Sequence, residues 1–234
     1  MRNHPISFTD SHRTRIERRI ESQNFHASFP SPRKNLSVAS SGGFVIHAMS
    51  NMPLVEITPP EFDVEIELAY ATADNFTGAP IYRRNTCYLH PDTAVRLRRV
   101  IKHAMPLGLR LRILDGFRPT EAQWALWNHT PDPDFVADPR RGSPHSRGAA
   151  VDLTLLDTAG HELDMGTGFD EFSDRAQHGF QDISPIAQRN RALLLGLMTI
   201  AGFDHYLLEW WHYQLHDSRR YPLFSDGAAG TQLM

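Results

Sequence analysis

Apolar and polar residues alternate along several short stretches of the chain, and each such stretch predicts a β-strand. The alternation is clear in residues 65–70 and 109–113, where every second side chain is large and apolar. A period of two places these side chains on one face, as expected for a half-buried strand. Residues 150–156 predict a further strand, followed by a hairpin loop and residues 161–165, and residues 207–215 predict the last strand.

Other stretches carry apolar residues every three or four positions, and this spacing predicts helices. Residues 91–104 follow it, and this helix is expected to stop before Gly108. A second helix is predicted to begin near residue 119 and to run through Trp127. Ser184, followed by a proline, predicts an N-cap, and its helix is expected to end at Gly202. Helices interspersed with hairpins predict an α+β fold, with helices packed on a mixed, mainly antiparallel sheet.

Residues 1–48 show no such periodicity and are rich in serine, arginine and histidine. A segment with few large apolar residues buries too little surface to offset an ordering entropy of about 1–2 kcal/mol per residue. We therefore expect a disordered N-terminal extension over residues 1–48 and one folded domain over residues 49–234. Two alternatives stay open. Translation could start at Met49 or Met52, or the segment could be a transit peptide, which its three acidic residues match poorly.

The overall composition is that of an ordinary globular protein, with 41% hydrophobic and 22% charged residues among 234. A net charge of −3 offers no basic excess for nucleic acid, so no such partner is expected. No apolar stretch approaches the roughly 18 residues that cross a membrane, and no secretory signal is recognised. The single cysteine, Cys87, excludes an intrachain disulfide and fits a reducing compartment. We expect a cytoplasmic protein without membrane association, and a homo-oligomer remains possible.

Two short motifs carry the candidate chemistry. One holds His145 and Asp152, and the other, near the C-terminus, holds Glu209 and His212. A catalytic zinc ion takes three protein ligands and leaves one position to water. His145, Asp152 and His212 would be those ligands, and Glu209 would be free to take a proton from the water. These residues indicate a mononuclear zinc peptidase with one zinc ion per chain.

The alternative for any one of the thirteen histidines is a core residue satisfied by hydrogen bonds. Asp152 argues against this alternative, because it stands between apolar residues and must be paired, metal-bound or neutralised there. His145 and Asp152 are seven positions apart, so on one straight strand they would face opposite sides. Gly148 between them permits a bend. Glu209 and His212 are three apart, and we expect a bulge or a strand start between them.

Arg118 lies where a predicted strand passes into a helix, in the segment 115–119. Cations are unfavourable near a helix N-terminus, which indicates a functional role rather than an exposed helix-start cation. A guanidinium near the zinc site would stabilise a developing oxyanion.

Four segments together resemble the VanX-type D-alanyl-D-alanine dipeptidases, a family of zinc D,D-peptidases that shares its fold with the hedgehog signalling domain. These segments are residues 70–78, 115–119, 145–155 and 209–212. The resemblance runs from about Val55 to Leu223, and the chain departs from it at Phe117, where relatives often have tyrosine, and loosely in residues 174–178.

The resemblance implies hydrolysis of the dipeptide D-Ala-D-Ala to two D-alanines. It implies zinc binding by the ligand set already proposed, Glu209 as general base and acid, and Arg118 as the group that stabilises the tetrahedral intermediate. Ser143 and Asp170 match positions that hold the two ends of the dipeptide. The dipeptide is a zwitterion, so Asp170 would accept its ammonium group, and leaving either end unpaired would cost roughly 1–3 kcal/mol.

Two rival interpretations remain open. One is a zinc D,D-peptidase of the same fold that acts on larger peptidoglycan peptides. The other is a zinc-binding module without catalysis, which would lack a base or an anion-stabilising group, whereas Glu209 and Arg118 are both present. Nutrient recovery and glycopeptide resistance would use the same chemistry.

Overall fold

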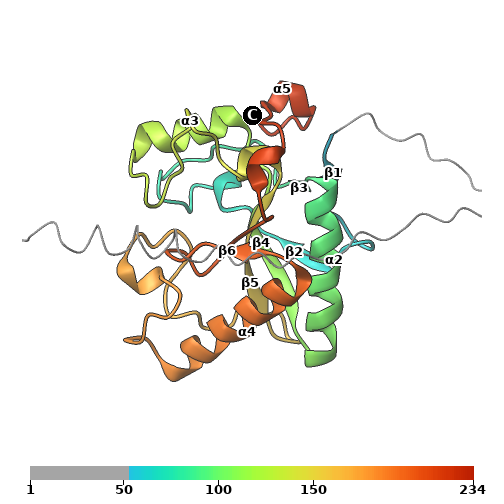
Figure 1. Cartoon of the computed structure of the whole chain (residues 1–234), viewed down its shortest axis with the longest axis vertical. Coiled ribbons are helices and arrows are strands. Elements are labelled where there is room, and N and C mark those ends of the chain that lie inside the picture. Colours follow the sequence, from blue (N-terminus) through green and yellow to red (C-terminus); the bar gives the residue numbers. More distant parts are fainter. Residues whose placement is uncertain (1–52) are drawn as a thin grey trace, which may run out of the picture. The chain divides into compact units, whose positions relative to one another are not determined.

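The computed structural model describes residues 53–234, and the expected disorder of residues 1–48 lies outside this range. A five-stranded sheet forms the centre of the described part of the chain (Figure 1). Its strands, in spatial order, are β2 (Val64–Ile66), β4 (Arg110–Asp115), β5 (Ala150–Leu156), β7 (His212–Gln214) and β6 (Asp204–His205). β2 runs parallel to β4, and the other neighbours are antiparallel. A separate two-stranded ribbon pairs β1 (Val55–Glu56) with β3 (Tyr88–Leu89).

Two long helices, α2 (Pro91–Ala104) and α4 (Pro185–Ala201), pack against each other and against the sheet. α3 (Thr120–His129) and the short α5 (Asp226–Ala229) lie together away from α4 (Figure 1). Single 3-10 turns occupy Ala69–Ala71, Met105–Leu107, His145–Arg147, Asp174–Ala176 and Ser218–Arg220. These elements confirm the predicted α+β class, with helices on a mixed, mainly antiparallel sheet.

The helix boundaries agree well with the sequence pattern. The helix predicted over residues 91–104 is α2, and Gly108 beyond it has a positive φ of 69°. Ser184 caps α4 as predicted, because its hydroxyl accepts a hydrogen bond from the Ala187 amide, and Gly202 ends the helix at φ 97°. Within residues 53–234 no helix is both long and apolar enough to cross a membrane.

Two predicted strands are shorter than expected. The strand over residues 65–70 ends at Ile66, because the Leu68 amide donates to the Asn85 side chain (2.9 Å) and the chain then turns through a 3-10 helix. The strand over residues 207–215 covers only β7. The hairpin after β5 has one bridge, between Leu156 and Glu162, and no second strand.

All seven residues of β5 are buried, which explains why this strand is apolar at most positions. Val151, Leu153 and Leu155 belong to the main hydrophobic core, together with residues of β4 and of both long helices. Since side chains alternate along a strand, Asp152 and Thr154 point to the opposite face from these three. β5 is hydrogen-bonded to β4 on one side and to β7 on the other, so the carboxylate of Asp152 is held at a fixed position in the sheet.

Candidate active site

The three candidate metal ligands come from adjoining elements. Asp152 on β5 pairs directly with His212 on β7 in the strand register. His145 lies in the 3-10 turn that precedes β5, and the chain bends at Gly148, where φ is 61°. A Cβ atom at Gly148 would lie 2.7 Å from the His90 amide nitrogen, so a side chain has no room there. The predicted bend is confirmed, and it brings His145 to the face on which Asp152 lies.

The side chains of these three residues converge. Their candidate ligand atoms all lie within 4.8 Å of one another, and all three residues are buried. His145 Nε2 lies 3.1 Å from His212 Nδ1, and Asp152 Oδ1 lies 3.3 and 3.0 Å from those two nitrogens. Two imidazole nitrogens at this distance cannot both present a bare lone pair to each other. Either a hydrogen on one of them or a bound metal ion has to lie between them.

Hydrogen bonds on the outer side of each ring determine which nitrogen faces the cluster. His145 Nδ1 donates to the Gly116 carbonyl oxygen (2.8 Å), which can only accept, so Nε2 carries the free lone pair. His212 Nε2 lies 3.1 Å from the Gln214 side-chain oxygen, which leaves Nδ1 facing Asp152. Histidine ligands of metal ions are oriented in this way. Two imidazoles and one carboxylate form a donor set that suits zinc, so the residues fit the metal that the sequence predicted.

The charge of Asp152 is maintained by its neighbours. Burial alone would raise the pKa of Asp152, but the charges and hydrogen bonds of His145 and His212 outweigh this effect and hold the pKa below its usual range. Asp152 is therefore an anion, as a metal ligand must be.

Glu209 is buried beside this cluster and is not part of it. Its Oε2 atom lies 3.9 Å from His212 Nδ1, and the residue precedes β7, so the expected strand start between Glu209 and His212 is confirmed. Burial raises the pKa of Glu209 well above its usual range, and the carboxylates of Asp152 and Asp170 raise it further. A carboxyl group in this state can hold a proton near neutral pH, which suits a general acid or base. The alternative of an exposed strand-edge charge does not apply.

Arg118 is buried as well, at 7% exposure, and is not an exposed helix-start cation. Its Nε and Nη2 atoms both lie 2.8 Å from Asp115 Oδ2, and Nη1 donates to the Gln123 side-chain oxygen (3.1 Å). Nη2 also lies 3.7 Å from Asp152 Oδ2, and the guanidinium packs 5.0 Å from the centre of the Tyr70 ring. These contacts hold the planar guanidinium in one orientation beside the candidate metal ligands.

Ser143 and Asp170 lie on loops. The buried Ser143 hydroxyl accepts a hydrogen bond from the His145 amide (3.2 Å), so this residue also supports the turn that carries His145. Asp170 adopts a positive φ of 56°, and its Oδ2 accepts a hydrogen bond from the Tyr70 hydroxyl (3.0 Å). Burial raises the pKa of Asp170 to about 8, and Arg118 opposes this shift.

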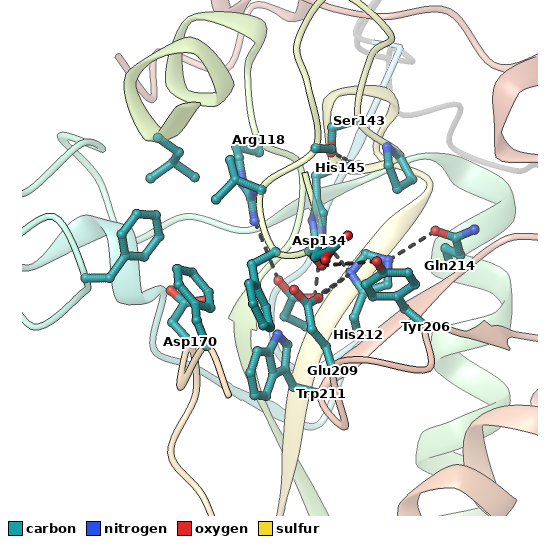
Figure 2. Close-up of a pocket in the computed structure, with 18 of the residues that line it drawn as sticks. Arg118, Asp134, Ser143, His145, Asp170, Tyr206, Glu209, Trp211, His212 and Gln214 are labelled. Atoms are coloured by element: carbon teal, nitrogen blue, oxygen red, sulfur yellow. Dashed lines mark hydrogen bonds and ion pairs between the residues drawn. The ribbon is translucent and has the colours of Figure 1, made fainter. Parts of the chain in front are cut away.

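All seven predicted site residues line one cavity of about 210 Å³. Figure 2 shows Asp170 on one side of it, Gln214 and Tyr206 on the other, and Glu209 and His212 between them. The cavity is small compared with the roughly 300–1,000 Å³ of pockets for drug-sized ligands. A cavity of this volume suits a small molecule.

Sequence reasoning did not single out several residues that support the site. Gln214 had a usable signal, because it lies two positions after His212 on a strand and therefore shares its face. Gln123, which binds Arg118 and donates to the Ala137 carbonyl (2.7 Å), had none. The aromatic lining from Phe76, Phe135, Phe172 and Tyr206 comes from separate loops, and no sequence spacing joins these residues.

Comparisons with known proteins agree on one family. A model of the peptidase M15 family, described as D-Ala-D-Ala dipeptidase, matches residues 50–226. The chain is 49% identical over 164 residues to the D-alanyl-D-alanine dipeptidase of Escherichia coli K12, covering 70% of this chain and 85% of that protein. It is 37% identical over 176 residues to the D-alanyl-D-alanine dipeptidase of Enterococcus faecium, covering 66% and 87%.

Among solved structures, the chain is similar to the vancomycin resistance D,D-pentapeptidase VanY, solved with Zn(II), at a TM-score of 0.37 and 18% identity over 68% of this chain and 82% of VanY. It is also similar to the LD-carboxypeptidase LdcB, at a TM-score of 0.39 and 18% identity over 77% and 72%. On the sequence matches, the chain belongs to the D-Ala-D-Ala dipeptidase family of M15 peptidases.

Proposed function

We propose that this protein hydrolyses free D-Ala-D-Ala to two D-alanines, with one zinc ion per chain bound by His145, Asp152 and His212. The observation that carries the proposal is that a candidate metal site and groups suited to acid–base catalysis and anion stabilisation line the same small cavity. A buried cluster with a zinc-like donor set lies beside a separate carboxyl group and a buried guanidinium. Membership of the dipeptidase family supports the substrate.

A zinc ion in the cluster would polarise the scissile carbonyl and make a water molecule easier to deprotonate. The positive charge would also offset the carboxylates that raise the pKa of Glu209, so Glu209 would be ionised and able to accept a proton. Glu209 takes one proton from the attacking water, whose oxygen bonds to the carbonyl carbon. The same carboxyl group then delivers that proton to the amine nitrogen as the carbon–nitrogen bond breaks.

Arg118 stabilises the oxygen that becomes anionic during the attack. Asp115 and Gln123 already bind the guanidinium, so it needs little reorganisation when charge develops on the substrate. Asp170 accepts a hydrogen bond from the ammonium group of the dipeptide, and the Ser143 hydroxyl donates one to the terminal carboxylate. Each end of the zwitterion then has a partner in the cavity.

The test is an assay of the zinc-loaded protein on D-Ala-D-Ala, L-Ala-L-Ala and a pentapeptide ending in D-Ala-D-Ala. We expect cleavage of the first only. Cleavage of the pentapeptide at a similar kcat/KM would favour the rival peptidase that acts on larger peptidoglycan peptides. Zinc binding without cleavage of any of the three would favour a non-catalytic module.

A further inference from the structure

Three phenylalanine side chains meet at the cavity lining, and we call Phe76, Phe135 and Phe172 the aromatic wall. The centroid of the Phe172 ring lies 4.9 Å from that of Phe135, and the two ring planes are nearly parallel, at 22°. The centroid of the Phe76 ring also lies 4.9 Å from that of Phe172, with 59° between the planes. All three rings line the cavity. Phe172 touches both of the others, so it is the central member of the wall.

The aromatic wall stands next to the carboxyl group of Asp170. Phe76 packs edge-on against Tyr70 at 6.2 Å, and the Tyr70 hydroxyl donates to Asp170. Phe172 is two residues after Asp170 on the same loop. The wall therefore lies just beyond the group that, in the proposed function, receives the ammonium group of the substrate.

The turn that carries Phe76 is held by the side chain of Asn75. Its amide nitrogen donates to the Thr72 and Ala79 carbonyls (2.7 and 3.0 Å), and its oxygen accepts from the Thr77 amide (2.8 Å). These bonds restrict the backbone on both sides of Phe76. Asn75 therefore supports the turn that places Phe76 in the aromatic wall.

We propose that Phe172 limits the substrate to two residues by blocking peptides that extend beyond the N-terminus of D-Ala-D-Ala. The inference rests on the proposed function. In an extended peptide, an amide replaces the ammonium group at Asp170, and the preceding residue has to enter the space of the aromatic wall. The half-buried ring of Phe172 contacts two other rings, so moving it out of the cavity lining breaks these aromatic contacts.

A purely structural role for Phe172 makes a different prediction. If the ring only joins two loops, its removal lowers stability and weakens cleavage of every substrate by the same factor. If the ring sets the length limit, its removal changes the ratio between substrates. The ratio of kcat/KM for the tripeptide Gly-D-Ala-D-Ala to kcat/KM for D-Ala-D-Ala distinguishes the two roles.

We expect Phe172→Ala to raise this ratio about tenfold or more, within the range that hydrophobic pockets achieve by size alone. Phe172→Leu should raise it less and serves where the alanine variant folds poorly. Calorimetric binding of the tripeptide to the zinc-loaded Glu209→Gln variant, with and without Phe172→Ala, gives a readout independent of turnover. The affinity should rise when the ring is removed.

Phe224→Ala is the matched control, because Phe224 is a partly buried phenylalanine that packs in a separate hydrophobic cluster and does not line the cavity. It should lower thermal stability and leave the ratio unchanged. An unchanged ratio in folded Phe172→Ala and Phe172→Leu would overturn the inference, as would efficient tripeptide cleavage by the wild-type protein. Failure of the wild type to cleave D-Ala-D-Ala would instead overturn the proposed function.

Discussion

The two ends of the cavity are built in different ways. At the metal end, Asp152 and His212 are paired residues of adjacent strands, and His145 is held by a backbone carbonyl and a single 3-10 turn. At the Asp170 end, the lining comes from loops that contact one another through side chains. Strand register determines the first arrangement, whereas aromatic packing determines the second.

This difference indicates how each end should respond to substitution. A ligand on a paired strand cannot be replaced by a neighbour, because one step along the strand points to the other face. Loops tolerate repacking, so changes there should alter selectivity and affinity by degrees. Predictions for the metal end are therefore close to all-or-none, and predictions for the Asp170 end are graded.

The largest effect is expected for the histidine ligands. His145→Ala or His212→Ala should abolish zinc retention and turnover together, because two remaining ligands hold the ion poorly. Elemental analysis and the dipeptide assay measure the two outcomes. His216→Ala is the control, since this histidine is exposed and pairs with Asp204 outside the cluster. Full zinc occupancy in either variant would show that the substituted histidine is not a zinc ligand.

Glu209→Gln should keep the zinc and lose about 10²–10⁴-fold in turnover, the usual contribution of a general acid–base group. The amide has nearly the same shape, so the buried position should tolerate it. Measuring zinc content alongside kcat shows whether the Glu209 carboxylate acts as a proton carrier or as a metal ligand. Loss of zinc would show that Glu209 is a ligand and that the assignment of Asp152 and Glu209 must change.

Arg118→Ala should lower turnover by about 10²–10³-fold, as expected when one donor to a developing oxyanion is lost. Stability should fall too, by about 3–5 kcal/mol, because Asp115 is fully buried and would lose its charged partner. Arg118→Lys keeps the charge without the planar fork and should recover only part of the activity. Wild-type turnover in a folded Arg118→Ala variant would exclude the residue from catalysis.

Local signals made the metal end predictable from the sequence. Gly148 between His145 and Asp152 marked the bend, and an acidic residue inside an apolar strand marked a charge that needs partners. Capping residues marked the ends of α4, because Ser184 and Gly202 act through neighbouring backbone groups. Each of these signals depends on residues that are close together in the chain.

The Asp170 end was less predictable because its contacts join distant segments. The strand predicted over residues 65–70 ended early when the Asn85 side chain bound the Leu68 amide across 17 positions. Tyr70 and Asp170 meet across 100 positions, and the rings of the aromatic wall come from three separate loops. No periodicity within one segment indicates such contacts, so tertiary packing alone creates them.

The last prediction concerns the pH dependence of stability at Asp170 in the zinc-free protein. The pKa of this carboxyl group is about 8 in the folded chain, against about 3.9 for an unfolded aspartate. Between these values the folded state keeps a proton that the unfolded state has released, so the free energy of unfolding falls as pH rises from about 4 to 8. Asp170→Asn cannot titrate and should remove this part of the fall.

Thermal unfolding at pH 5 and pH 8 measures the effect. From pH 5 to pH 8 the Tm of the wild type should fall further than the Tm of Asp170→Asn. Asp182→Asn, an exposed position outside the cavity, should leave the pH dependence as it is in the wild type. A parallel decline of stability in Asp170→Asn and the wild type would mean that Asp170 is already ionised in the folded chain. The loop end of the cavity would then hold a fixed negative charge before any ammonium group arrives, and its affinity for the dipeptide would not depend on releasing a proton from Asp170.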